Sequence, residues 1–245
     1  MFRKDQRPRA TKAMTEERKM TVVEHLEELR ERLIKSAIAL MVTTLFSLLF
    51  ASRFLKILIA PAGNIKPIFL RPTEGFITYM RVALLSGVAL AMPIIVYQTI
   101  RFIVPGLKAS ERRYLYVILP GAAISFLAGI AFAYFAMLPF ALRYLLKFGS
   151  DIAEAKWAIG EYIAFVTSLM FWVGVVFETP LLVFFLAKLG IVTPGMLSSN
   201  RKYAVLAIAI LAAVITPTPD PFNMLLVMAP LVVLYEIGVL LARLA

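Results

Sequence analysis

The sequence predicts an all-α membrane protein that crosses the bilayer several times. Of its 245 residues, 61% are hydrophobic and only 17% are charged, and its mean hydropathy is +0.84. A soluble domain is about 45–50% apolar and about 25% charged. The apolar residues form long runs separated by short polar segments, an arrangement that suits lipid as the solvent. The chain has no Cys and a single His, which excludes disulfides, zinc–thiolate sites and two-His metal cages. We therefore expect no metal and no other cofactor.

The first 20 residues differ in character from the rest of the chain. Residues 1–20 are polar and basic without apolar periodicity, so we expect a flexible extension in front of a six-span membrane domain at 21–245. From Val22 to Leu33, apolar residues recur at helical spacing with charged residues between them. This pattern predicts an amphipathic helix at the cytoplasmic surface that runs directly into the first span.

Six apolar runs predict six transmembrane helices. They lie at about 33–52, 76–104, 114–146, 162–187, 203–215 and 222–241. At about 1.5 Å per residue, the fifth run is about 20 Å long, against a hydrocarbon core of about 30 Å. The hairpin that it forms with the sixth run therefore requires a thinned bilayer or burial against neighbouring helices.

Positive charge predicts the orientation in the membrane. Eighteen of the 26 Lys and Arg residues lie in the terminal segments or in polar segments on the same side as the termini, and seven lie on the other flanks. Cytoplasmic segments of membrane proteins carry such an excess. We therefore expect a multi-pass plasma (inner) membrane protein with both termini in the cytoplasm. The formal charge of +11 is explained in this way without nucleic acid as a partner.

A series of motifs in order along the chain carries a family resemblance. They are His25-Leu-Glu-Glu-Leu-Arg-Glu-Arg-Leu33, Arg71-Pro-Thr-Glu-Gly-Phe76, Met92-Pro-Ile-Ile-Val-Tyr-Gln98, Phe102-Ile-Val-Pro-Gly-Leu107, Glu111-Arg-Arg113, Phe132-Ala-Tyr-Phe135 with Pro139, Phe177-Glu-Thr-Pro180, and Thr216-Pro217 with Asp220. From about Val22 to Leu244, this ordered set resembles the TatC family, a subunit of the twin-arginine protein translocase.

The resemblance implies both a fold and a function. The family has a concave, glove-like bundle of six helices and binds signal peptides that carry consecutive arginines. It assembles with the small single-span subunits TatA and TatB, so we expect a homo- or hetero-oligomer in the lipid bilayer. The assembly exports folded proteins using the proton-motive force, and TatC is not an enzyme.

Two cytoplasmic acids are the residues that the resemblance assigns to the signal peptide. Glu28 and Glu111 would each accept one guanidinium, which is always charged and presents a planar fork that a carboxylate can accept bidentately. Arg30 and Arg32 would shape the same surface. Simpler roles are also open to both acids: Glu28 can pair with Arg32 at i, i+4, and Glu111 can simply begin a helix.

Glu178 is an ionisable residue inside the fourth apolar run. At membrane depth such a group costs about 2.5–3.5 kcal/mol, so it requires a partner or water. We expect a polar site in the concave face; the alternatives are a structural hydrogen bond or a position near the interface. Glu236 lies in the sixth run and is expected to be structural, with Arg243 seven residues on. Arg81, in the second run, could neutralise one of these acids.

The resemblance also points to residues that the family keeps for activity. Four of them are Pro61, Phe102, Tyr134 and Asp220. Each also has a simpler role: Pro61 can form a turn, and Phe102 can pack against other side chains. Tyr134 can belong to an aromatic belt at the interface, and Asp220 can cap a turn. The chain departs from the family at the sixth helix, where the usual glutamine is replaced by Met224 and Asn223 precedes it. Since one residue rotates a helical side chain by about 100°, Asn223 does not point where the family's glutamine, which helps to receive a partner helix, would point.

Other functional classes fit the sequence less well. A proton-coupled secondary transporter would use Glu178 and Glu236 as proton carriers, yet the internal repeat common to many transporters is missing. An intramembrane hydrolase would need a second His, a nucleophile motif or paired aspartates. No Walker A pattern is present, so ATP is not used directly.

Overall fold

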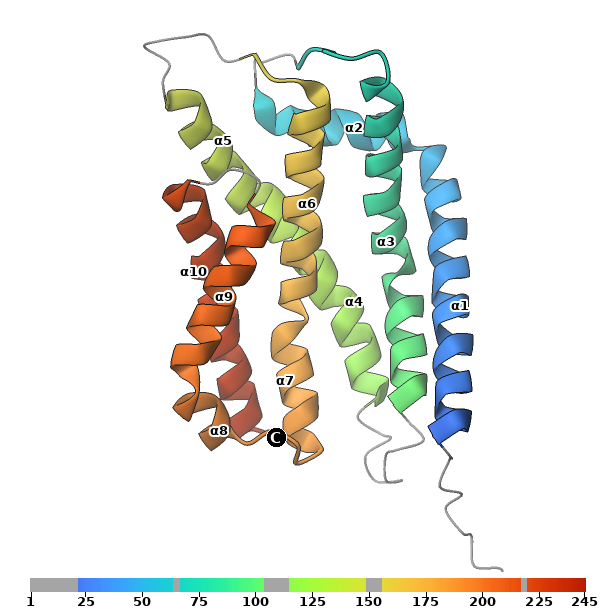
Figure 1. The fold of residues 1–245 in the computed structure, drawn as a ribbon, viewed down its shortest axis with the longest axis vertical. Helices are drawn as coiled ribbons and strands as arrows, with labels where there is room; N and C mark the ends of the chain where they lie inside the picture. Colours follow the sequence, from blue (N-terminus) through green and yellow to red (C-terminus); the bar gives the residue numbers. More distant parts are fainter. Residues whose placement is uncertain (1–21, 64–66, 104–114, 149–155, 217–219) are drawn as a thin grey trace, which may run out of the picture.

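The computed structural model describes residues 22–63, 67–103, 115–148, 156–216 and 220–245 (Figure 1). Within these ranges the regular structure is helical apart from one isolated β-bridge. In chain order, the elements are α1 (Val22–Leu48), α2 (Ala51–Ile59), the 3₁₀ turn η1 (Ala60–Ala62), α3 (Glu74–Ile103), α4 (Leu115–Phe132), the π-helical segment η4 (Ala133–Met137), α5 (Leu138–Lys147), α6 (Ile159–Phe177), α7 (Thr179–Lys188), α8 (Pro194–Ser199), α9 (Arg201–Ile215) and α10 (Pro221–Arg243).

Several helices have the length and composition of membrane spans. Among the described residues, four helical segments are long and apolar enough to cross a membrane: α3, residues 118–147 of α4–η4–α5, residues 159–188 of α6–α7, and α10. The pair α1 and α2 adds a fifth if the two helices count as one broken span, because they meet at a bend of 78°. Helix α9 has only 15 residues, about 22 Å. The end of α9 and the start of α10 lie below the level of α2 in Figure 1.

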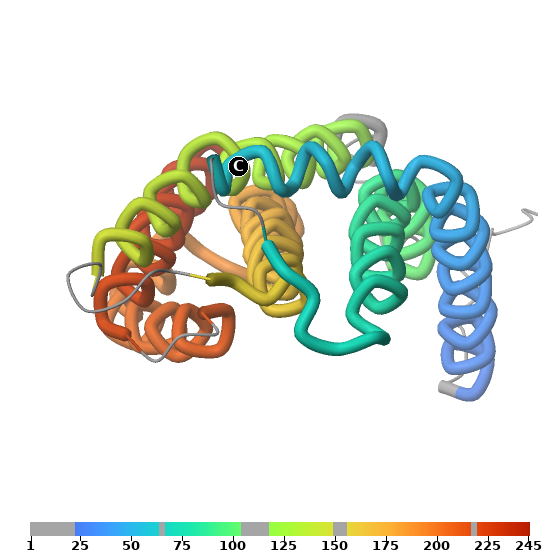
Figure 2. The backbone as a smooth tube through the Cα atoms, turned by 90° about the horizontal axis from the view of Figure 1, so that it is seen from above, coloured from blue at the N-terminus to red at the C-terminus, as the bar shows by residue number. Residues whose placement is uncertain are grey.

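The helices form a curved bundle. Helix α1 packs along α3, and α2 lies across the far end of the bundle (Figure 1). Seen from above, the elements follow an arc with α1 at one end and α9 and α10 at the other (Figure 2). The start of α1 and the end of α10 lie at the same end of the bundle. The predicted all-α, concave bundle is therefore observed.

Helix α2 is a separate element, whereas the apolar run predicts a first span that continues to residue 52. Ala51, Leu55 and Leu58 recur every three or four residues and are buried, whereas Arg53 and Lys56 are exposed. Such a strongly amphipathic segment is suited to lie along an interface rather than across the hydrocarbon. The chain therefore bends after Leu48 instead of continuing through the membrane.

Polar contacts fix the far end of the bundle. Tyr134 and Tyr162 donate their hydroxyl protons to the carbonyls of the last turn of α2, at 2.9 and 2.8 Å. The strand-like residue Ile68 exchanges two backbone hydrogen bonds of 2.9 Å with the segment that enters α6. These bonds connect α2 and the segment before α3 to the centre of the bundle.

Close helix contacts are made at small residues, as is common in membranes. A Cβ atom built on Gly129 of α4 would lie 2.8 Å from the Cα atom of Gly174 of α6, and one on Gly87 of α3 would lie 2.7 Å from the Cα atom of Thr44. Thr43 of α1 donates to the Gly87 carbonyl at 2.8 Å. Larger side chains at these glycines would push α1 from α3 and α4 from α6.

Candidate functional site

The start of α1 is held against the end of α3 by side chains. The ring of His25 stacks on the ring of Phe102, with centroids 4.3 Å apart and planes 18° apart. Seven residues further along α1, the Nη1 atom of Arg32 donates to the Oε1 atom of Gln98 at 3.3 Å. Phe102, singled out by the family resemblance, therefore packs directly beside the region expected to bind peptide.

Glu28 lies in this α1–α3 junction, which we define by His25, Glu28, Arg32, Gln98 and Phe102. Its Oε1 atom accepts from the Nη2 atom of Arg32 at 3.1 Å, and the side chains of Arg32 and Glu28 are only 20% and 12% exposed. The i, i+4 pairing that the spacing allows is therefore present. The Oε2 atom of Glu28 and the Nε atom of Arg32 are buried, and neither has a hydrogen-bond partner in the described part of the chain.

A nearby pair on the same helix shows what is unusual about Glu28. Glu31 and Lys35 also form an i, i+4 ion pair, at 2.6 Å, but both side chains are about half exposed. Water can satisfy the remaining oxygen of Glu31, whereas the second oxygen of Glu28 is shielded from it. A buried acceptor without a donor is costly, so Glu28 can still accept a further charged donor.

The other residues assigned to this surface are only partly placed. Arg30 is exposed on α1, whereas Arg32 faces α3. Glu111 lies outside the described residues, in the segment that joins α3 to α4. The structure therefore brings Glu28, Arg32 and Phe102 together and leaves the relation of Glu111 to them untested.

Glu178 lies at the junction of α6 and α7. The helix breaks here: the Glu178 amide donates to the carbonyl of Val175, three residues back, at 3.1 Å, and Pro180 supplies no amide proton. Ser125 of α4 donates to the Phe177 carbonyl at 2.6 Å, which stabilises the break. Glu178 is 9% exposed, and its Oε1 atom is buried without a partner among the described residues.

The depth of Glu178 favours a site inside the membrane over one at the interface. The α6–α7 rod runs from Ile159 to Lys188, which is about 45 Å at 1.5 Å per residue. Glu178 lies ten residues before its end, or about 15 Å. With a hydrocarbon core of about 30 Å, this places the carboxyl group several ångströms from the bilayer centre.

The remaining candidates lie at the far end of the bundle. Pro61 forms the η1 turn after α2, and Tyr134 holds the end of α2 as described above. Asp220 caps α10: its Oδ1 atom accepts from the Asn223 amide at 2.7 Å, and its Oδ2 atom accepts from the Asn223 side chain at 2.8 Å. Asn223 is buried in this cap, and Met224 packs partly buried against the core.

Glu236 and Arg81 have partners that residue spacing does not indicate. Glu236 pairs with Arg201 of α9, at 2.7 Å, and not with Arg243 of its own helix. Arg81 donates to the backbone carbonyl of Gly160 at 2.9 Å and forms no ion pair with either acid in the described structure. Glu236 thus pairs with an arginine of the neighbouring helix and not with the arginine seven residues further along its own helix.

Comparison with known proteins decides the family. A family model described as Sec-independent protein translocase protein (TatC) matches residues 24–230. The chain belongs to the TatC family. It is 42% identical to the Sec-independent protein translocase protein TatC of Carboxydothermus hydrogenoformans over 230 residues, which are 93% of this chain and 95% of that protein. The TatC protein of Desulforapulum autotrophicum is 38% identical, over 93% of this chain and 86% of that protein.

Solved TatC structures share the fold. A crystal structure described as twin arginine translocase receptor TatC superimposes with a TM-score of 0.82 at 37% identity, covering 90% of this chain and 98% of that one. A second crystal structure of the receptor, in DDM, gives a TM-score of 0.83. The predicted six-span concave fold is consistent with these TatC structures. This TatC family member is thus a multi-pass membrane component of a protein translocase, and the transporter alternative is not supported.

Sequence reasoning missed several residues that shape these sites. Gln98 and His25 stand inside the family motifs but carry no signal of their contacts across 66 and 77 residues. Ser125 and Tyr162 lie in apolar runs, where a hydroxyl group is unremarkable until its acceptor on another helix is known. Their roles depend on helix packing, which neither spacing nor composition encodes.

Proposed function

We propose that this TatC family member is the core receptor subunit of a twin-arginine translocase. It binds signal peptides with paired arginines, assembles with TatA- and TatB-type single-span subunits, and exports folded proteins using the proton-motive force. One observation carries the proposal: the largely buried Glu28 carboxylate has a shielded oxygen with no donor among the described residues, at the packed α1–α3 junction. A peptide guanidinium is a donor that suits this oxygen.

The proposed recognition uses two acids for two arginines. Glu28 accepts one guanidinium and Glu111 the other, while Arg32 is displaced or shares the Glu28 carboxylate with the peptide. Arg30 and Arg32 keep the surrounding surface positive. Only a strong donor of the right shape can therefore take the place of Arg32 at the Glu28 carboxylate. This selects a planar guanidinium over the compact ammonium group of lysine.

Glu178 is proposed to act inside the membrane. Its buried Oε1 atom at the helix break, which lacks a partner in the described structure, would accept a hydrogen bond from a translocating segment or from a polar residue of a partner helix. In the same scheme, the far-end residues Pro61 and Tyr134 position α2, and the cap of Asp220 and Asn223 shapes the α9–α10 edge for a partner helix.

Export in cells tests the proposed function. The chain is expressed in a bacterium that lacks its own TatC, together with TatA and TatB subunits from the same source as this chain. A folded reporter with a paired-arginine signal should then be exported, and the same reporter with paired lysines should remain in the cytoplasm. An uncoupler should stop export. Export of both reporters, or of neither, would contradict the proposal.

The proposed orientation gives a second expected result. Both termini and α8 are assigned to the cytoplasm, and the segment before α3 to the outside, on the charge asymmetry. In intact cells an impermeant maleimide should label Thr73→Cys but not Ser199→Cys, which should react only after permeabilisation. Since the chain has no Cys of its own, only the introduced cysteine can react in it. Labelling of Ser199→Cys from outside would invert the topology.

A further inference from the structure

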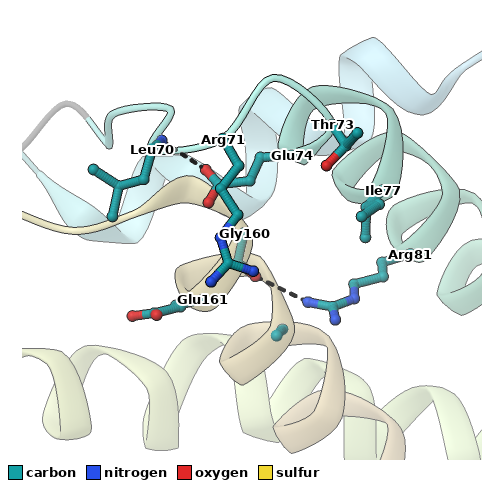
Figure 3. Close-up of a pocket in the computed structure, with 9 residues that line it drawn as sticks. Leu70, Arg71, Thr73, Glu74, Ile77, Arg81, Gly160 and Glu161 are labelled. Carbon is teal, nitrogen blue, oxygen red and sulfur yellow. Dashed lines mark hydrogen bonds between the residues drawn. The ribbon is translucent and has the colours of Figure 1, made fainter.

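Two adjoining pockets form a hollow between α3 and α6. Its end near the start of α3 is a pocket of about 310 Å³ that contains the charged residues Arg71, Glu74, Arg81 and Glu161 (Figure 3). Below it, a groove of about 390 Å³ is lined mainly by apolar side chains of α1, α3 and α6. Arg81 and Ala164 line both, so the polar pocket adjoins the apolar groove. A ligand that filled both would therefore be polar at one end and apolar along the rest.

The two arginines have unused donors. Arg81 is exposed and donates one bond, of 2.9 Å, to the Gly160 carbonyl. Arg71 is exposed, and neither arginine has an acid within ion-pair distance among the residues that the structure describes. Both side chains extend from the α3 side toward the first turn of α6 (Figure 3). Because a guanidinium carries five N–H groups, most donors here are available for an anion.

The depth of Arg81 matches a lipid phosphate. Helix α3 has 30 residues, about 45 Å, which exceeds the hydrocarbon core by roughly 7 Å at each end. Arg81 lies seven residues into α3, or about 10 Å, so its Cα atom is close to the edge of the hydrocarbon. A long side chain at this depth reaches upward to the head-group layer. The apolar groove below it then lies at the depth of the acyl chains.

We propose that this hollow binds one glycerophospholipid. The phosphate is held by Arg71 and Arg81, and one acyl chain lies in the groove along α1, α3 and α6. Glu74 also lines the pocket, and its Oε2 atom accepts from the Leu70 amide at 3.0 Å. Glu161 lines the same pocket and is exposed, so its carboxylate is placed to accept from the amine of an ethanolamine head group. The site does not depend on the proposed peptide recognition.

Native mass spectrometry of the delipidated protein in detergent tests this site. A phosphatidylethanolamine with two long acyl chains should bind at one saturable site. Arg81→Gln should weaken it about tenfold, as expected for a charge-assisted bond near the interface. Arg143→Gln, an exposed arginine of α5 outside the hollow, is the matched control and should leave binding unchanged. Glycerophosphoethanolamine without chains should bind at least about tenfold more weakly than the lipid, because it leaves the apolar groove empty.

Two further variants separate the head group from the chain. Glu161→Gln should remove any preference for the ethanolamine lipid over its phosphatidylcholine counterpart without abolishing binding of either. Ala164→Phe should weaken lipid binding by filling the groove while both arginines are kept. If Arg81→Gln and Arg71→Gln bind the lipid with the affinity of the parent, or if lipids attach without saturation, the proposed site is wrong.

Discussion

Replacing Glu28 by Gln is expected to weaken binding of a paired-arginine peptide by roughly ten- to a hundredfold. The loss removes one charge-assisted hydrogen bond, which contributes about 1.5–3 kcal/mol. It also leaves Arg32 without its counter-ion, so that its charge repels the incoming guanidinium. Salt screening at the cytoplasmic surface places the effect toward the lower end of this range. The measurement is peptide affinity for the purified protein in detergent.

Two variants show whether Glu28 acts through the peptide or only through its helix. Arg32→Gln breaks the same internal ion pair but keeps the acid and removes its competing cation, so peptide affinity should be retained or increased. Glu31→Gln removes an acid of an exposed i, i+4 pair on the same helix and should bind like the parent. Equal losses for Glu28→Gln and Arg32→Gln would show that only the intrahelical pair matters.

Glu178→Ala is expected to lower export roughly tenfold or more at normal protein abundance, which corresponds to the loss of about one charge-assisted hydrogen bond. The Oε1 atom of Glu178 is buried without a partner among the described residues, so we expect the loss of this carboxyl group to cost little free energy of unfolding. A loss of export would therefore reflect function rather than folding. Glu178→Gln keeps a hydrogen-bonding oxygen and should retain more activity than Ala if hydrogen bonding, and not charge, is needed.

Glu236 provides the matched control for this acid. It also lies in an apolar run, but its side chain is 42% exposed and pairs with Arg201. The charge of Glu236 is already paired within the bundle, so Glu236→Ala should export nearly as well as the parent. Export at the parent level by Glu178→Ala, with normal abundance, would show that this carboxyl group is dispensable.

The sequence predicts where the long helices lie along the chain better than it predicts how the helices pack against one another. Long apolar runs and their polar breaks indicate α3, α6–α7 and α10 because lipid requires such runs. Helix α2 is not predicted as a separate helix, because it has only nine residues and is followed closely by Pro61, a pattern that is typical of a loop. Its direction is set by burial of one face against the bundle. The short helix α8 also lies in an expected loop; Thr193 caps it by accepting from the Met196 amide at 3.2 Å.

In the candidate site, too, contacts within one helix can be predicted from the sequence, whereas contacts between helices cannot. The Glu28–Arg32 pair follows from helical spacing and is observed. The contact of Arg32 with Gln98, and the pairing of Glu236 with Arg201, depend on how separate helices pack, which residue spacing does not specify. Family resemblance can assign Glu28 to peptide binding, but only the structure indicates that one of its oxygens is buried without a donor among the described residues.

The most direct test of recognition by paired carboxylates compares a paired-arginine peptide with its paired-lysine counterpart on the purified protein. The parent should prefer the arginine peptide about tenfold or more, because lysine cannot form the bidentate contact. Glu111→Gln should lower affinity for the arginine peptide and reduce this preference. Equal binding of both peptides by the parent, or unchanged arginine binding in Glu111→Gln at low and moderate salt, would contradict recognition by paired carboxylates.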